Sequence, residues 1–226
     1  MVASAGETYL RLASYEAAAG RMGEILDVGC GDGLFFDALL QLGDVEGVEV
    51  SPALAGKNGK HTARIHVGNF DPTLKLNTNF GLILMLDVLE HMRDPASALR
   101  YALTLLAPNG KILITVPAFQ SLWTSHDVLN EHIVRYTKRT FRSVARDAGL
   151  QIENDNYFFH WLFPVKMLTR ISENILGSRP RPPRLPPRRI NQALYWFSLL
   201  ENRALYGGRL PFGSSLLVFG SRMSAG

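Results

Sequence analysis

The stretch "ILDVGCGDGLF" at residues 25–35 places three glycines at alternate positions after a short apolar run. An apolar strand that leads into a glycine-rich turn and then a helix presents backbone N–H groups and a helix N-terminus to a ligand. The stretch therefore predicts a ligand site on Gly29, Gly31 and Gly33, with Asp27 at the end of the strand. A tight strand-to-helix turn without a ligand remains an open interpretation of the same residues.

The glycine spacing discriminates between cofactors. A dinucleotide fingerprint, G-x-G-x-x-G counted from Gly29, requires glycine at position 34, where the chain has Leu34. A phosphate-binding P-loop requires G-K-[ST] after the glycines, and that motif does not follow them. The pattern G-x-G-x-G therefore disfavours both a dinucleotide and a nucleoside triphosphate.

Length and composition indicate one globular domain with an insertion. The chain has 226 residues, 46% of them hydrophobic, which is enough for one substantial core. Its one cysteine, Cys30, excludes an internal disulfide, and "MVASAGETYL" (1–10) shows no secretory signal. We therefore expect a cytoplasmic protein. The net charge of +4 is compatible with an anionic partner.

Short apolar runs alternate with helical patterns along the first two thirds of the chain, which predicts a parallel sheet with crossover helices. A first helix is expected at about 7–20. A second is marked by Asp94 as N-cap and Pro95 in the first turn, and a third spans about 138–148. The expected strands are 25–28, 45–50, 65–67, 80–86 and 111–116, the last entered through a turn at 108–110.

The C-terminal part has a different pattern. Helical segments at about 161–176 and 190–206 flank the Pro/Arg stretch "GSRPRPPRLPPRR" (177–189), which is expected to be a linker because proline lacks the N–H that helices and central strands need. A last strand is expected at 214–222. We expect a core of 1–158 plus 210–226 and a helical insertion of 159–209.

Four stretches in this order resemble the class I S-adenosylmethionine-dependent methyltransferases, in the branch that acts on small molecules or lipid-like substrates. They are "ILDVGCGDG" (25–33), "VEGVEVSP" (45–52), "LMLDVLEHMRDPASAL" (84–99) and "LLAPNGKILITVPA" (105–118). The resemblance covers roughly residues 7–158. It implies a doubly wound, mostly parallel seven-stranded α/β sheet (Rossmann-like), with a helical insertion before the last strand and S-adenosylmethionine as cofactor.

The resemblance implies a set of cofactor-binding residues. Glu49 matches the acid that holds both ribose hydroxyls, and a carboxylate is suited to this because both of its oxygens accept hydrogen bonds. The family often has an acid at the adenine amino group and an aspartate after the aromatic residue that opens the fourth strand; this chain has Asn69 and Gly81 there. The complete expected set is Asp27, Gly29, Cys30, Gly31, Glu49, Val50, Asn69, Phe70 and Leu86.

The segment 117–141 follows the fifth strand and is expected to lie over the cofactor's methyl group, because ligands bind beyond the carboxyl ends of parallel strands. It resembles a branch pattern of His-Asp, His and Arg-Tyr. The candidate catalytic residues are His126, His132 and Tyr136, and the candidate substrate-binding residues are Trp123, Asp127 and Arg135. A backbone-bonded histidine and an arginine paired with Glu131 are the structural alternatives.

Three further groups of side chains, at His91, Cys30 and the loop histidines, are candidates for the cofactor pocket or for a metal. His91 is expected either to line the methionine end of the pocket or to cap the helix that follows, and Cys30 to be a small residue in a tight turn. No metal site is expected, because His126 and His132 stand six apart without a further cluster in the sequence.

The insertion contains "FFHWLFPVKMLTRI" (158–171) followed by five arginines within 179–189. These features are compatible with peripheral contact to the inner membrane surface, or with a lid that packs on its own core. No nucleic acid is expected, because no stacking aromatics interleave with the arginines.

The sequence thus predicts methyl transfer to a small-molecule or lipid-like acceptor, at oxygen, nitrogen or carbon. An NAD-dependent oxidoreductase is the competing enzyme, and Leu34 opposes it. A non-catalytic nucleotide-binding module of the same fold is the other alternative, and the intact glycines oppose that one.

Overall fold

The computed structural model describes residues 23–57, 59–76, 79–176, 187–204 and 210–223. These residues form one seven-stranded sheet of order β3-β2-β1-β4-β5-β7-β6, in which β7 runs antiparallel to both neighbours and the other pairs are parallel. The expected doubly wound, mostly parallel fold is confirmed. The strands are β1 (Glu24–Val28), β2 (Asp44–Glu49), β3 (Ile65–Val67), β4 (Phe80–Leu86), β5 (Leu106–Pro117), β6 (Leu150–Phe158) and β7 (Ser215–Arg222).

Helices cover both faces of the sheet because alternate strand residues point to opposite sides. In β4, Ile83 and Met85 join the hydrophobic cluster formed with α4 and α6, whereas Leu82 and Leu84 join the cluster formed with α2 and α3. The helices are α2 (Phe36–Leu39), α3 (Pro52–Ala55), α4 (Pro95–Leu105), α5 (Ser125–Leu129), α6 (Lys138–Ala148), α7 (Leu162–Leu176) and α8 (Arg188–Ala204). Three short 3₁₀ turns are η1 (Thr62–Arg64), η2 (Leu89–His91) and η3 (Gln120–Leu122).

Local signals place the helix ends where the sequence predicted them. The Asp94 carboxylate accepts a hydrogen bond from the Ser97 N–H at 2.9 Å, so Asp94 rather than His91 caps α4. Gly149 ends α6 in the left-handed region, at φ 80°.

One boundary differs from the prediction. β5 begins at Leu106 and includes the expected turn at 108–110, because Leu106 pairs with Phe80 and the register then shifts, with Asn109 at φ 63°.

Two helices separate β6 from β7, as the sequence indicated. Both expected helices are present, as α7 and α8, within the part of the chain that the structure describes. The expected first helix at 7–20 and most of the Pro/Arg stretch, residues 177–186, lie outside the described residues. The division into a core and an insertion stays a prediction.

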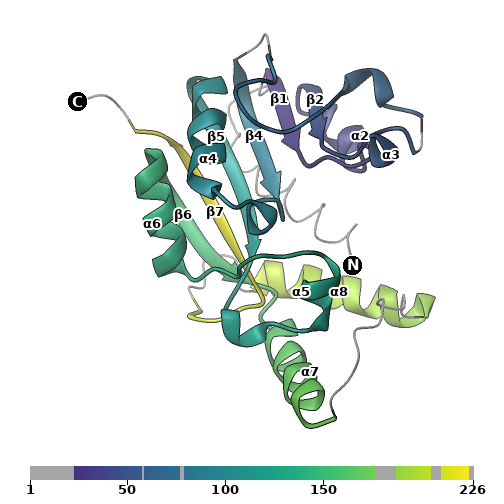
Figure 1. The fold of residues 1–226 in the computed structure, drawn as a ribbon. Coiled ribbons are helices and arrows are strands. Elements are labelled where there is room, and N and C mark those ends of the chain that lie inside the picture. Colours follow the sequence, from purple (N-terminus) through teal and green to yellow (C-terminus); the bar gives the residue numbers. More distant parts are fainter. Residues whose placement is uncertain (1–22, 58, 77–78, 177–186, 205–209, 224–226) are drawn as a thin grey trace.

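The loops of interest gather at one end of the sheet. Figure 1 shows α5, α7 and α8 beyond the end toward which the arrowheads of β4 and β5 point. Because parallel strands share the direction of their carboxyl ends, the segments after β1, β2, β4 and β5 meet at this end. The candidate site is therefore built from loops on a rigid sheet.

Asp94→Ala is expected to lower the free energy of unfolding by about 1 kcal/mol, because it removes the acceptor for the Ser97 N–H. Urea unfolding followed by circular dichroism measures the change. Ser97→Ala is the matched control, since only the backbone of Ser97 takes part in the cap. Equal losses in the two variants would contradict the capping role.

Candidate active site

The glycine loop approaches the neighbouring strand closely. Gly29 and Gly31 have φ of 74° and 59°, a region that glycine enters without strain. The N–H groups of Gly29 and Cys30 both donate to the Val48 carbonyl, at 2.8 and 3.2 Å. A Cβ on Gly29 would lie 2.7 Å from a Val88 methyl carbon. The loop therefore requires glycine at this position for both its conformation and its packing.

Glu49 joins this loop to the end of β2. Its carboxylate accepts the Gly31 N–H at 2.9 Å on one oxygen and the Ser51 N–H at 2.8 Å on the other. The side chain is buried. Each oxygen has a second acceptor site, so Glu49 is held in place and is still able to accept from a ligand's hydroxyl groups.

Asp27 is a buried carboxylate at the end of β1. Its Oδ2 atom has no hydrogen-bond partner among the residues that the structure describes. Burial is the main cause, and the nearby charge of Glu49 the second, of a pKa of Asp27 that is raised to about 7. A buried polar atom without a partner is costly, so its presence beside the glycine loop is a sign of a ligand.

The two acids set the charge preference of the site. Within the part of the chain that the structure describes, neither Asp27 nor Glu49 forms an ion pair with a basic side chain. Two uncompensated carboxylates favour a cationic ligand and repel an anionic pyrophosphate. A sulfonium cofactor that also carries an ammonium group and a ribose diol fits this loop, whereas a dinucleotide does not.

The other expected cofactor residues differ in their location and burial. Asn69 and Phe70 line a cavity of about 250 Å³ with residues of the α4 N-terminus, and the Phe70 ring packs 4.9 Å from the Tyr101 ring. Val50 is exposed and Leu86 is half-buried, each at the carboxyl end of its strand. Buried Cys30 has a thiol whose pKa burial raises to about 12, which suits a small residue in a turn.

A larger cavity of about 580 Å³ lies elsewhere, between α6 and β6. It borders none of the expected site residues.

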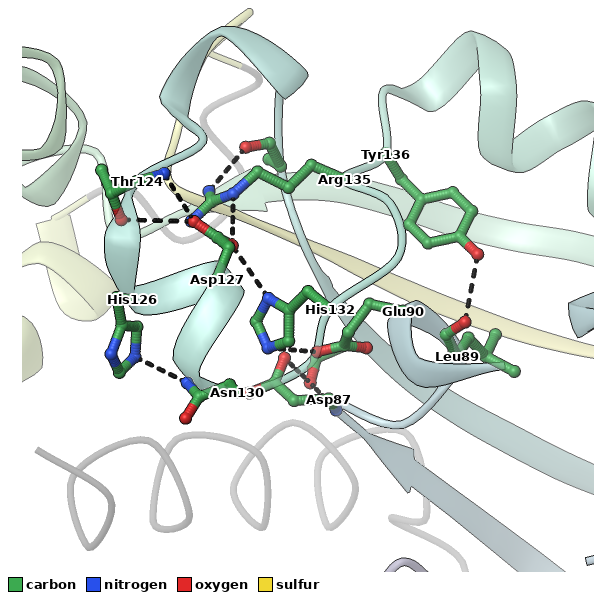
Figure 2. A network of polar contacts seen from close by, with 12 residues as sticks. Asp87, Leu89, Glu90, Thr124, His126, Asp127, Asn130, His132, Arg135 and Tyr136 are labelled. Carbon is green, nitrogen blue, oxygen red and sulfur yellow. Dashed lines mark hydrogen bonds and ion pairs between the residues drawn. The ribbon is translucent and has the colours of Figure 1, made fainter. Parts of the chain in front are cut away.

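A buried ionic network organises the loop after β5, as Figure 2 shows. Arg135 donates to both oxygens of Asp127, at 2.8 and 2.9 Å, and to the Ala118 carbonyl at 3.1 Å. The Thr124 N–H donates to the same carboxylate at 2.8 Å, and His132 Nδ1 lies 2.8 Å from it. Burial alone would raise the pKa of Asp127, but the hydrogen bonds from His132 and Arg135 hold it well below its usual value. Asp127 is therefore the charged centre of the loop.

The second ring nitrogen of His132, Nε2, faces away from Asp127 and toward Glu90. Nε2 lies 3.9 Å from an oxygen of Glu90, and the rings of His132 and His91 meet edge to face at 4.9 Å. Glu90 is fully buried, and within the described part of the chain neither of its carboxylate oxygens has a hydrogen-bond partner. Burial, with the nearby charge of Asp87, raises the pKa of Glu90 well above its usual value. Ligand atoms of Glu90, His91 and His132 lie within 4.8 Å of one another, a cluster that sequence spacing did not indicate and that is able to hold a cation.

Backbone strain gathers around the same loops. Asp87, Phe119 and Glu131 all have φ between 54° and 57°, a region that residues other than glycine seldom adopt. Asp87 directly follows β4, and the other two residues lie in the segment after β5. Strained residues persist where the surrounding structure holds them, and they concentrate at functional sites.

The other expected loop residues differ in burial and in their hydrogen-bond partners. Tyr136 is 2% exposed, its hydroxyl donates to the Leu89 carbonyl at 3.3 Å, and burial raises its pKa to about 12, which favours a structural role over the expected catalytic one. Arg135 is 3% exposed and pairs with Asp127 rather than Glu131, so burial and this ion pair favour a structural role over substrate binding. His126 is exposed and contacts Asn130, and Trp123 is half-buried.

Sequence reasoning missed Lys166, which α7 brings to this site. Lys166 is half-buried, and its charge interacts with those of Arg135, Asp127 and Asp87. Burial is the main reason why its pKa falls to about 8. The signal for an inward-facing lysine in this segment is the three-to-four-residue spacing of its polar side chains.

Comparisons with known proteins identify the family of the chain. A family model described as a methyltransferase domain matches residues 4–154. The ubiquinone biosynthesis O-methyltransferase of Xanthomonas euvesicatoria pv. vesicatoria is 24% identical over 181 residues, covering 70% of this chain and 76% of the relative. That of Coxiella burnetii is 31% identical over 98 residues, covering 40% and 42%.

Solved structures show the same fold. A TehB-like SAM-dependent methyltransferase from Corynebacterium glutamicum superposes with a TM-score of 0.57 at 20% identity, over 96% of this chain and 88% of the other. Phosphoethanolamine N-methyltransferase 2 from Haemonchus contortus, in complex with S-adenosyl-L-methionine, has a TM-score of 0.60 at 16% identity, over 96% and 53%.

Fold, glycine loop and paired acids together define a class I S-adenosylmethionine-dependent methyltransferase. The chain belongs to the methyltransferase domain family that matches residues 4–154. S-adenosylmethionine is its cofactor, and the oxidoreductase alternative is not favoured. The same findings support a small-molecule acceptor.

Asp27→Asn is expected to stabilise the unliganded protein by ~4 kcal/mol at pH 8, because it removes a buried charge. The folded-state pKa of about 7 lies above the unfolded value of 3.8, so the ionised group destabilises the fold, and the penalty disappears as the pH falls toward 3.8. Urea unfolding at pH 8 and pH 5 measures the difference. A gain that is equal at both pH values, or absent, would contradict the assignment.

Proposed function

We propose that this enzyme methylates a hydroxyl group of a small, phenol-like or lipid-like acceptor, with His132 as the general base. The observation that carries the proposal is the pair formed by His132 and Asp127, in which Nδ1 lies 2.8 Å from the buried carboxylate. A base is required only when the acceptor has a proton to lose, as a hydroxyl does. Curated relatives named as O-methyltransferases also support oxygen as the acceptor atom.

The chain's own residues supply binding, orientation and proton removal. When bound, S-adenosylmethionine supplies an electrophilic methyl group on a sulfonium. Glu49 would hold the ribose hydroxyls, and Asp27 would favour the cationic end of the cofactor. Asp127 accepts the Nδ1 proton of His132, which leaves Nε2 free to accept the hydroxyl proton. A phenol suits a histidine base, because its pKa of about 10 is far closer to that of imidazole than an aliphatic alcohol's is.

His132→Gln is expected to lower kcat for a catechol by about 100-fold or more, because the acceptor keeps its proton. Its affinity for S-adenosylhomocysteine should remain that of the unmodified protein, since no cofactor-binding residue is changed. Release of S-adenosylhomocysteine from S-adenosylmethionine with 3,4-dihydroxyphenylethanol as acceptor measures the rate.

His126→Gln is the matched control, because His126 is exposed and contacts Asn130 rather than the buried carboxylate. It is expected to keep most of the activity. Equal loss in the two variants, or full activity in His132→Gln, would show that His132 is not the base.

We also propose that α7 and α8 rest on an anionic membrane surface. On α7 the outward side chains Val165, Leu168, Ile171 and Ile175 repeat at helical spacing and are exposed, Ile175 to 75%. The described part of α8 exposes a second such face, with Ile190, Trp196, Phe197 and Leu200.

The charge near these faces favours acidic lipid as the occupant. Arg188 and Arg189 are exposed at the start of α8, and the whole chain carries a net charge of +4. Among the described residues no helix is long and apolar enough to cross a membrane. Helices that lie in the interface with their apolar faces buried are the geometry that fits.

Leu168→Ser combined with Ile175→Ser is expected to reduce flotation with phosphatidylcholine vesicles that contain phosphatidylserine, because it removes apolar area from the outward face of α7. Leu54→Ser, on exposed Leu54 of α3, is the control. Binding by the unmodified protein should weaken as salt is raised. Absent or salt-insensitive binding would contradict the proposal, and so would a concentration-dependent dimer that buries these faces.

A further inference from the structure

Helix α7 turns its charged residues toward the protein together with Phe163 and Met167, and it turns four large aliphatic residues outward. Phe163, Lys166, Arg170 and Glu173 repeat at three to four residues and are all half-buried, whereas Leu168 on the opposite side is 67% exposed. Helices that cover a soluble core have the reverse pattern. The inward face of α7 is therefore polar because it borders a polar site.

Two contacts fix α7 against the loop after β5. The Phe163 ring lies 5.7 Å from the Phe119 ring, edge to face. Two turns or more further along, the Glu173 carboxylate accepts hydrogen bonds from Ser125, from its N–H at 2.9 Å and its hydroxyl at 2.6 Å. Lys166 lies between these anchors on the same face of the helix, so its position over the loop is defined.

The ammonium group of Lys166 has no carboxylate partner at ion-pair distance among the residues that the structure describes. The charged and titratable groups near it are Asp87, His126, Asp127 and Arg135. Asp127 is already bound to Arg135 and His132, so its charge is largely satisfied. Lys166 has therefore lost water without gaining a close partner, and burial accordingly lowers its pKa to about 8.

We propose that Lys166 is a specificity residue that binds a carboxylate group on the acceptor. The sequence suggested Arg135 as a substrate-binding residue, but Arg135 is buried and uses three of its five N–H donors on Asp127 and the Ala118 carbonyl. A half-buried ammonium gains most from an anionic oxygen, and His132 already serves the hydroxyl that is methylated. The inference rests on the proposed function, because it requires an acceptor that binds beside His132.

The test compares two catechols of similar size, 3,4-dihydroxyphenylacetate and 3,4-dihydroxyphenylethanol, in which a carboxylate replaces a neutral hydroxymethyl group. Calorimetry measures their dissociation constants for the protein saturated with S-adenosylhomocysteine. We expect the unmodified protein to bind the acid about ten-fold more tightly than the alcohol. Lys166→Met should remove this preference, and Lys166→Arg should restore most of it.

Lys57→Met is the matched control, because it removes an exposed lysine just after α3. It should keep the preference for the acid. Unchanged affinity of each variant for S-adenosylhomocysteine shows that the fold is intact. No preference for the acid in the unmodified protein, or a preference that survives in Lys166→Met, overturns the inference.

Methylation of the neutral alcohol tests the proposed function separately. If the alcohol is not methylated while the acid still binds through Lys166, the proposed hydroxyl transfer fails and the carboxylate site stands. If the alcohol is methylated but the acid does not bind more tightly than the alcohol, the hydroxyl transfer stands and the carboxylate site at Lys166 fails.

Discussion

The fold buries two carboxylates at the ends of adjacent parallel strands, and we propose that these two acids select the cofactor. Register places Asp27 of β1 beside Gly47, two residues before Glu49 of β2. A side chain at Gly47 would lie 2.4 Å from the Cys30 sulfur, so only glycine lets the turn pack against β2. This packing brings the Gly31 N–H within hydrogen-bond distance of the Glu49 carboxylate. Strand pairing, glycine and acid thus form one unit, and its uncompensated negative charge favours a cationic cofactor.

A second buried charge organises the chemistry. Asp127 is satisfied by Arg135, by the Thr124 backbone and by His132. Removing one partner of such a network leaves a buried charge uncompensated, which typically costs about 3–5 kcal/mol, so the loop keeps one arrangement. In that arrangement Nδ1 of His132 is held by Asp127, and Nε2 points away from Asp127. Helix α7 then closes the loop from outside through Glu173, and Lys166 comes with it.

The sequence predicted local features well because local patterns determine them. The glycines, Glu49 and the Asp94 cap follow from strand, turn and helix signals within about ten residues. The pairing of Asp127 with Arg135 was not predictable, because it depends on how the loop folds back on itself. Lys166 and buried Glu90 were missed for the same reason: their surroundings come from segments distant in the sequence. The methyltransferase motifs therefore predict the cofactor residues from the sequence alone, whereas the contacts on the acceptor side depend on three-dimensional packing.

The most direct test of the central claim is calorimetric titration of the unmodified protein and of Glu49→Ala with S-adenosylhomocysteine and with NAD. The account predicts tight binding of S-adenosylhomocysteine, little binding of NAD, and loss of at least about ten-fold in affinity on mutation, because the ribose hydroxyls lose a charged acceptor. Binding of NAD in preference, or S-adenosylhomocysteine affinity that survives in Glu49→Ala, would contradict it.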